Sequence, residues 1–248
     1  MGDSMNHHQK LAPRERVIVA LDVPDCAALE TLLDRLDGRP AFYKVGLELF
    51  VAEGERAVEM VRARGGHVFL DLKLHDIPET VARAVASAAR VQAELLTLHT
   101  SGGYEMLARA AEAAAGRVKL LGVTVLTSLA EDDLRAEGVE QTIPEMVRAR
   151  ARIAARAGIA GLVCSPLEIE AARGAAPGLL IVVPGIRPAA APGAAKGIGH
   201  QDDQKRVATA GQAIANGADY LVVGRPVRDA ADPAAAFEAL VREVEAAV

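Results

Sequence analysis

The sequence predicts a single α/β domain, a (β/α)8 TIM barrel in which parallel strands alternate with helices around a closed ring. Three observations predict this fold. The chain has 248 residues, a length typical of such barrels. Short apolar runs recur along it, separated by amphipathic, alanine-rich segments that often end in glycine. No linker divides the sequence, so we expect one catalytic domain over residues 14–248, preceded by a disordered lead-in over residues 1–13.

The predicted strands are short and rich in β-branched residues, as buried parallel strands usually are. In chain order they are VIVAL (17–21), AFYKV (41–45), HVFLDL (67–72), LLTLH (95–99), VKLLGVTVL (118–126), GLVCS (161–165), LLIVVPG (179–185) and YLVVG (220–224). Helical periodicity between them is clearest in ERAVEMVRARGG (55–66), ETVARAVASAARV (79–91), PEMVRARARIAARAG (144–158) and RVATAGQAIANGA (206–218). Chemistry in this architecture sits on the loops after the C-terminal ends of the strands, so the site is expected there.

Composition excludes several classes of function. The formal net charge of −5 and the pI near 5.7 give no basic field for a polyanion, so nucleic acid is not an expected partner. Cys26 and Cys164 lie far apart and form no CxxC motif, which favours reduced thiols in a cytoplasmic protein and gives no cysteine metal site. The segment MGDSMNHHQK (1–10) has no apolar core, and no apolar run approaches a membrane span, so we expect neither export nor a membrane.

The densest polar stretch is DLKLHDIPET (71–80), where the third predicted strand meets the next helix. Side chains alternate along a strand, so Asp71 and Lys73 share one face while the leucines between and before them take the other. That face points into the mouth of the barrel, where an anionic ligand would compensate the burial of charge. An ordinary ion pair at a strand end is the alternative.

Two residues that follow this pair, His75 and Asp76, have structural interpretations of their own. With Glu79 three positions on, Asp76 has the spacing of the N-cap in a capping box, and Pro78 then lies in the first helical turn. His75 stands beside a turn, where a histidine more often forms a structural hydrogen bond than takes part in catalysis.

Most of the other predicted strands also contain or precede residues that suit a polar site. They are Asp22, Lys44, Thr127, Ser128, Arg187, Gly224 and Arg225. Each alone fits a helix cap or a surface charge, but together they converge on one rim. Two guanidinium groups and a backbone N–H after the last two strands suit a phosphate dianion, which predicts a phosphorylated small-molecule substrate.

A long loop rich in Gly, Pro and Ala, RPAAAPGAAKGIGHQDDQ (187–204), follows the seventh strand. Loops of this length inside compact domains are often lids or binding loops, which we favour here over featureless surface sequence.

Motifs in chain order now connect these features to a family. LDVP, YKVG, DLKLHDIPET, VTVLTS, PGIRP, DQKR and VVGRPV make the chain from residue 16 onward resemble orotidine 5'-phosphate decarboxylases of the bacterial short type. The resemblance implies a homodimeric barrel that converts orotidine 5'-monophosphate to UMP and CO2 in pyrimidine biosynthesis, without a metal or organic cofactor. DxKxxD alone is shared with sugar-phosphate decarboxylases of the same superfamily.

The resemblance also implies roles for the strand-end residues. Lys73 would protonate C6 of the pyrimidine, and Asp71 would lie beside the substrate carboxylate. Lys44 and Asp22 would be the ribose-side members of the charge network. Asp76, Ile77 and Thr80 would reach the neighbouring subunit's site. Thr127 would contact the pyrimidine edge, and the phosphate would be held by Gln204, Gly224 and Arg225, with Arg187 nearby.

The phosphate glutamine has two candidates. The family commonly reads Gly-Asp-Gln-x-Arg, whereas this chain reads QDDQKR, with Asp202 in place of the glycine. Both Gln201 and Gln204 are therefore possible, and the following Lys205 and Arg206 favour Gln204.

Two other functions compete with the decarboxylase. The first is a sugar-phosphate decarboxylase or aldolase of the same superfamily, against which the complete KLHDIPET and VTVLTS motifs argue. The second is a non-catalytic phosphate-binding barrel, which would gain nothing from a repelling carboxylate such as Asp71 at the site.

Overall fold

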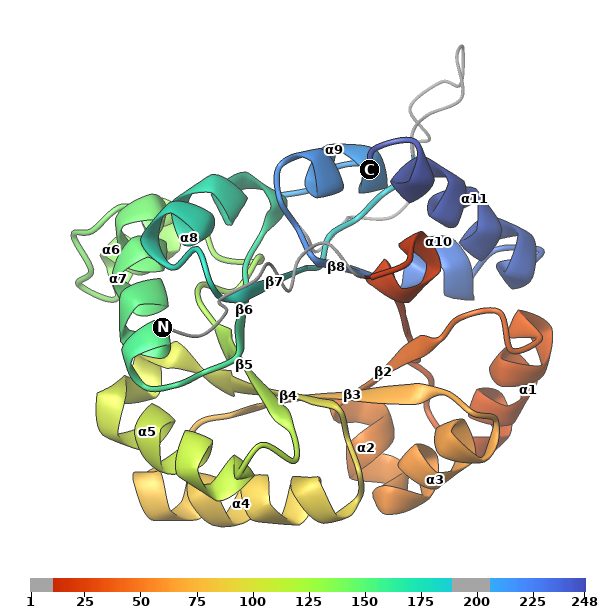
Figure 1. Cartoon of the computed structure of the whole chain (residues 1–248), viewed down its shortest axis with the longest axis horizontal. Coiled ribbons are helices and arrows are strands. Elements are labelled where there is room, and N and C mark those ends of the chain that lie inside the picture. The colour runs from red at the N-terminus through yellow and green to blue at the C-terminus, as the bar shows by residue number, and fades with distance from the viewer. Residues whose placement is uncertain (1–10, 189–205) are drawn as a thin grey trace, which may run out of the picture.

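The computed structural model describes residues 11–188 and 206–248 and confirms the closed barrel. Strands hydrogen-bond in chain order, every pair is parallel, and the last strand pairs with the first (Figure 1). The strands are β1 (Val17–Ala20), β2 (Phe42–Gly46), β3 (His67–Leu74), β4 (Leu95–His99), β5 (Lys119–Val123), β6 (Gly161–Val163), β7 (Leu180–Val183) and β8 (Tyr220–Val223).

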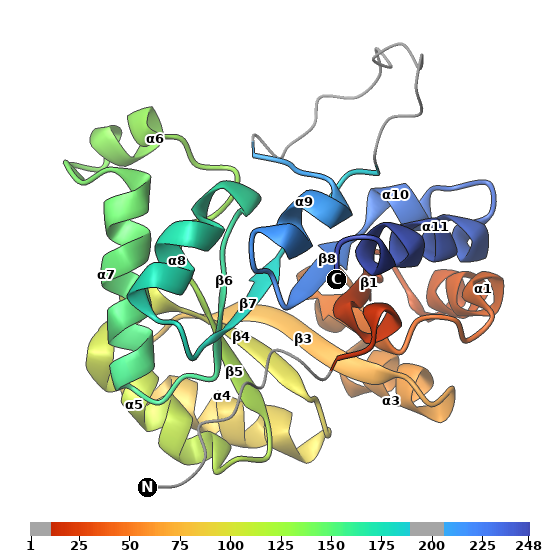
Figure 2. The ribbon, with the colours of Figure 1, turned by 45° about the horizontal axis from the view of Figure 1, so that its top comes forward.

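Helices surround the strands on the outside (Figures 1 and 2). The α-helices are α1 (Cys26–Leu36), α2 (Leu47–Glu53), α3 (Glu55–Ala63), α4 (Pro78–Arg90), α5 (Gly103–Ala114), α6 (Glu131–Ala136), α7 (Ile143–Arg156), α8 (Ile169–Ala175), α9 (Ala210–Ala215), α10 (Arg225–Arg228) and α11 (Pro233–Glu245). Short 3-10 helices are η2 (Pro13–Arg16), η3 (Thr100–Gly102) and η4 (Pro166–Glu168). α11 packs against α1, which closes the ring of helices.

Each predicted strand run overlaps one observed strand, but the ends differ. The runs predicted over residues 118–126 and 161–165 end early, at Val123 and Val163, because the chain then turns into the loops at the rim. β3 instead extends to Leu74, past a register shift against β4 between Leu70 and Leu74.

Alternation along the strands creates two cores. One lies inside the barrel and contains residues such as Ile18, Phe69 and Leu121, and the other lies between the strands and the helices. On β3, Phe69 faces inward and Leu70 faces the helices, so Asp71 and Lys73 continue the inward face, as predicted. The apolar floor beneath them supports the charged side chains at the C-terminal rim.

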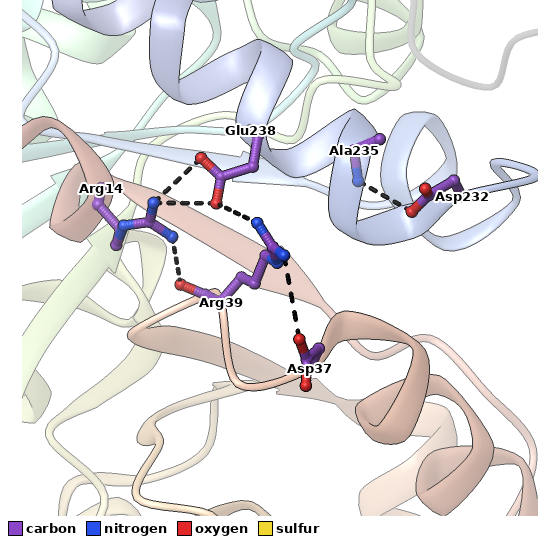
Figure 3. A network of polar contacts seen from close by, with 6 residues as sticks. All are labelled: Arg14, Asp37, Arg39, Asp232, Ala235 and Glu238. Carbon is purple, nitrogen blue, oxygen red and sulfur yellow. Dashed lines mark hydrogen bonds and ion pairs between the residues drawn. The ribbon is translucent and has the colours of Figure 1, made fainter.

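The opposite end of the barrel is held by ion pairs that join the first and last elements (Figure 3). Arg14 in η2 donates to Glu238 of α11 and to the carbonyl of Arg39, and Arg39 also lies 3.4 Å from Glu238. Asp232 caps α11 by accepting from the N–H of Ala235. Arg14 and Arg39 directly precede β1 and β2 in the chain, so their contacts with α11 serve closure of the fold rather than the chemistry at the other rim.

Several predictions fall on undescribed residues. These are most of the loop predicted over residues 187–204, together with Gln201 and Gln204 and residues 1–10 of the expected lead-in. Within residues 11–188 and 206–248, no helix is long and apolar enough to cross a membrane.

Candidate active site

A cavity of about 450 Å³ opens at the C-terminal ends of the strands. Predicted site residues from six βα units line it, namely Asp22, Lys44, Asp71, Lys73, Thr127, Arg187, Gly224 and Arg225. Aliphatic side chains including Val123, Val163 and Val222 complete its walls. The convergence that the strand ends predicted is therefore present in the fold.

Charges alternate along one wall of this cavity, across three neighbouring strands. Lys44 Nζ lies 2.8 Å from Asp22 Oδ1 and 3.6 Å from Asp71 Oδ2. Lys73 Nζ lies 2.8 Å from Asp71 Oδ1. Each carboxylate thus faces at least one ammonium group, and each ammonium faces a carboxylate. This arrangement keeps four charges together in a partly buried place without a net excess of either sign.

Asp71 is the centre of the array, and its side chain is only 15% exposed. Burial raises the pKa of Asp71. The ammonium groups of Lys44 and Lys73, together with hydrogen bonds from Lys73 and Thr97, lower it by more, so the pKa of Asp71 lies below its ordinary value. Asp71 is consequently ionised at neutral pH, and it fixes the position of the Lys73 ammonium.

Lys73 has an unusual backbone conformation. Its φ is 50°, in the left-handed region that few residues other than glycine adopt. The Lys73 N–H donates to Thr97 Oγ1 at 2.9 Å, and the same hydroxyl donates to Asp71 Oδ1 at 3.0 Å. Thr97 therefore holds both members of the pair, and the strained backbone at Lys73 coincides with the register shift of β3.

Cations gather on the other side of the cavity, after β7 and β8. Gly224 is the N-cap of α10, and Arg225 is the first residue of that helix. Arg187 and Arg228 also line the cavity, and Arg228 Nη1 donates to the carbonyl oxygen of Asp22 at 2.9 Å. This end of the cavity suits an anionic group, while the alternating array occupies the end at β2 and β3.

Other predicted residues do not line this cavity. Asp76, Ile77 and Thr80 are all exposed on the segment that follows β3. Ser128 lies in the turn after β5, next to Thr127, but is not part of the lining. His75 is exposed and its ring lies 5.3 Å from that of His99.

The capping box predicted for α4 is wrong. The N-cap is Ile77, not Asp76, and Pro78 lies in the first helical turn, as expected. Asp76 Oδ1 instead accepts from the N–H of the next residue at 2.6 Å, and Glu79 pairs with Arg83 and Arg109. The helix begins one residue later than the box requires, so Glu79 does not reach back to Asp76.

Three residues of the site were not predicted from the sequence: Arg228 and Cys164, which line the cavity, and Thr97, which holds Asp71 and Lys73. Thr97 is the one hydroxyl in the run LLTLH, a signal hidden by the high strand propensity of threonine. Arg228 follows Arg225 by one helical turn, a spacing that predicts a shared face. Cys164 lines the cavity as a free thiol, and burial raises its pKa, so it stays protonated and is not a nucleophile.

Thr97→Val is expected to lower the free energy of unfolding by about 1–3 kcal/mol, because the partly buried Lys73 N–H loses its acceptor while the volume is unchanged. Urea unfolding followed by circular dichroism measures this. The matched control is Thr31→Val, whose exposed hydroxyl bonds within α1, and its effect is expected to stay within about 0.5 kcal/mol. Equal effects of the two variants would contradict the role of Thr97.

Comparison with known proteins decides the family. The model of the orotidine 5'-phosphate decarboxylase / HUMPS family matches residues 15–240. The chain belongs to this family. A decarboxylase of that name from Anaeromyxobacter sp. (strain K) is 51% identical over 231 residues, which cover 93% of this chain and 98% of the relative. One from Desulfosudis oleivorans is 46% identical over 244 residues, covering 96% of each chain.

Solved structures agree with the family assignment. The crystal structure of orotidine 5'-phosphate decarboxylase from Lactobacillus acidophilus is similar with a TM-score of 0.79 and 34% identity, over 93% of this chain and 99% of that one. The barrel is therefore the family's fold along nearly its whole length.

Proposed function

We propose that the protein decarboxylates orotidine 5'-monophosphate to UMP and CO2, a step of pyrimidine biosynthesis. The observation that carries this proposal is the array Asp22, Lys44, Asp71 and Lys73, which lines the cavity of a chain about half identical to proteins named for that reaction. The names of the relatives also favour it over the sugar-phosphate alternative and over a non-catalytic barrel.

Lys73 is the proposed catalytic acid. Cleavage of the bond between C6 and the carboxylate releases CO2 and leaves an electron pair on C6. The Lys73 ammonium, held 2.8 Å from Asp71, stabilises that carbanion and then gives it a proton, and water restores the ammonium. Asp71 lies beside the departing carboxylate and fixes the ammonium before the charge develops. Because Lys73 supplies both the cation and the proton, the proposed reaction uses no metal or organic cofactor.

The remaining residues are proposed to bind the rest of the nucleotide. Lys44 and Asp22 lie at the far end of the array, where they contact the ribose hydroxyls. Arg187, Gly224 and Arg225 hold the phosphate, since guanidinium groups and a backbone N–H suit its oxygens. Thr127 contacts the edge of the pyrimidine. Gln204, proposed to close on the phosphate, lies outside the described residues.

The protein is proposed to act as a homodimer in which Asp76, Ile77 and Thr80 enter the partner's site. Support comes from large apolar side chains that are exposed after consecutive strands: Leu47 (52%), Val51 (81%), Ile77 (67%) and Tyr104 (50%). Exposed apolar side chains that follow neighbouring strands are available to an interface on that side of the barrel. Two free, buried cysteines support the proposed cytoplasmic location, where thiols stay reduced.

Loss of the orotidine 5'-monophosphate absorbance on adding the purified protein tests the proposed function directly, with UMP identified by chromatography. Hexulose phosphate is the matched alternative substrate. Turnover of the sugar phosphate without turnover of the nucleotide would replace the proposal by the superfamily alternative.

Gly46→Ala is expected to weaken substrate binding, raising KM about tenfold with little change in stability. An added Cβ would lie 2.8 Å from Lys44 Nζ and 3.1 Å from Asp22 Oδ1, so the flexible lysine must move away from the aspartate. Steady-state kinetics and thermal unfolding measure the two effects. Gly174→Ala is the control, because nothing lies within 4 Å of the position that its added Cβ would take. An unchanged KM would show that the Asp22–Lys44 contact does not serve binding.

A further inference from the structure

A buried ion pair lies behind the cavity, outside its lining. Arg206 is 9% exposed and Glu168 is 2% exposed, and Arg206 Nη1 donates to Glu168 Oε1. The other oxygen of Glu168 accepts from the N–H of Ser165 at 2.9 Å, next to Cys164 in the cavity wall. The pair thus ties the segment that precedes α9 to the segment that follows β6.

The second branch of the guanidinium reaches the loop after β5. Arg206 Nη2 donates to the carbonyl oxygen of Leu126 at 2.9 Å. The same carbonyl accepts from the N–H of Leu129 at 3.0 Å, which closes a β-turn with Thr127 and Ser128 at its centre. Because Leu126 and Thr127 both line the cavity, Arg206 holds the turn that presents Thr127 to the site.

Stability alone is a poor explanation for this pair. Removing two charges from water is costly, and an apolar pair of similar volume is often at least as stable. The planar guanidinium of arginine binds a carboxylate and a carbonyl at once in fixed directions, and an apolar pair cannot do this. Arg206 Nε has no hydrogen-bond partner among the described residues, so the guanidinium is placed by its two Nη contacts.

We propose that Arg206 is a positioning residue for the pyrimidine half of the site. Held by Glu168, it fixes the Leu126 carbonyl and thereby the orientation of the Thr127 turn. Arg206 itself touches no substrate. This inference rests on the proposed function, since the contact between Thr127 and the pyrimidine edge is part of that proposal.

Two ligands that differ only in the base test the inference by calorimetry. UMP has the pyrimidine, and ribose 5-phosphate lacks it. Arg206→Met is expected to lower the affinity for UMP about tenfold, while its affinity for ribose 5-phosphate stays that of the wild type. If the single variant unfolds, the double variant Glu168→Gln/Arg206→Met replaces it, because it leaves no unpaired buried charge. It too is expected to bind UMP more weakly and ribose 5-phosphate as the wild type does. Equal weakening of both ligands, or of neither, would overturn the inference.

A double-mutant cycle shows whether Arg206 acts through the turn. In a Thr127→Ala background, the Arg206 substitution is expected to have no further effect on UMP, because the contact that it positions is already gone. Independent, additive losses would overturn the proposal. Turnover by the wild-type protein tests the proposed function separately from the role of Arg206. If the wild type is active and the losses are additive, only the role of Arg206 is refuted.

Discussion

Lys73→Ala is expected to lower kcat/KM for orotidine 5'-monophosphate by about four orders of magnitude or more while the barrel stays folded. The substitution removes the cation that faces the developing carbanion and the proton donor to C6, each of which is typically worth about 10²–10⁴-fold. The Lys73 side chain is 31% exposed at the rim, so no apolar core is lost. Steady-state assays measure the loss, and circular dichroism checks the fold.

The same variant should change the dependence of stability on pH. The pKa of Asp71 is held below its ordinary value, partly by Lys73, so ionised Asp71 stabilises the fold above its ordinary pKa and loses this effect as pH falls through the native pKa. Without Lys73 the native pKa rises. The variant should therefore begin to lose this stabilisation at a higher pH than the wild type during acid titration.

Lys119→Ala is the matched control, because Lys119 is exposed at the N-terminal end of β5, away from the rim that carries the site. It is expected to leave both activity and acid stability unchanged. Near-normal turnover by Lys73→Ala would refute the proposed role of Lys73, whatever the family of the chain.

The sequence predicted the barrel because each strand is a compact apolar run between amphipathic segments, and a parallel barrel buries such strands on both faces. Strand ends were harder to predict. VKLLGVTVL keeps a strand-like pattern to Leu126, yet β5 ends at Val123, and beyond that end the carbonyl of Leu126 accepts from Arg206. That contact comes from a residue 80 positions away, so local pattern does not reveal it.

The charged wall of the site was predictable for a different reason. Alternation along β3 places Asp71 and Lys73 on one face, and parallel neighbours bring Lys44 and Asp22 to the same rim. Thr97 was not predictable in this way, because its role depends on which β4 residue lies beside the register shift of β3. The capping box at Asp76 had the right spacing, but the observed helix starts one residue too late for it.

Mixing two inactive variants is expected to restore activity if the active site is shared between subunits. Asp76 is exposed and does not line the cavity of its own chain, whereas Lys73 does. In the proposed two-fold dimer, each site takes Lys73 from one subunit and Asp76 from the other. Lys73→Ala and Asp76→Ala proteins, each nearly inactive alone, are unfolded together and refolded, and turnover is then measured.

The expected recovery is about a quarter of wild-type activity. Random pairing makes about half of the dimers mixed, and in each mixed dimer one site has both defects while the other has neither. The control mixes Lys73→Ala with Asp71→Ala, two residues that lie 2.8 Å apart within one chain. Every site in those mixed dimers keeps one defect, so no activity should return. If mass spectrometry confirms mixed dimers and the Asp76 mixture also stays inactive, then Asp76 does not serve the partner's site, and its contact with the N–H of Ile77 is its only remaining observed role among the described residues.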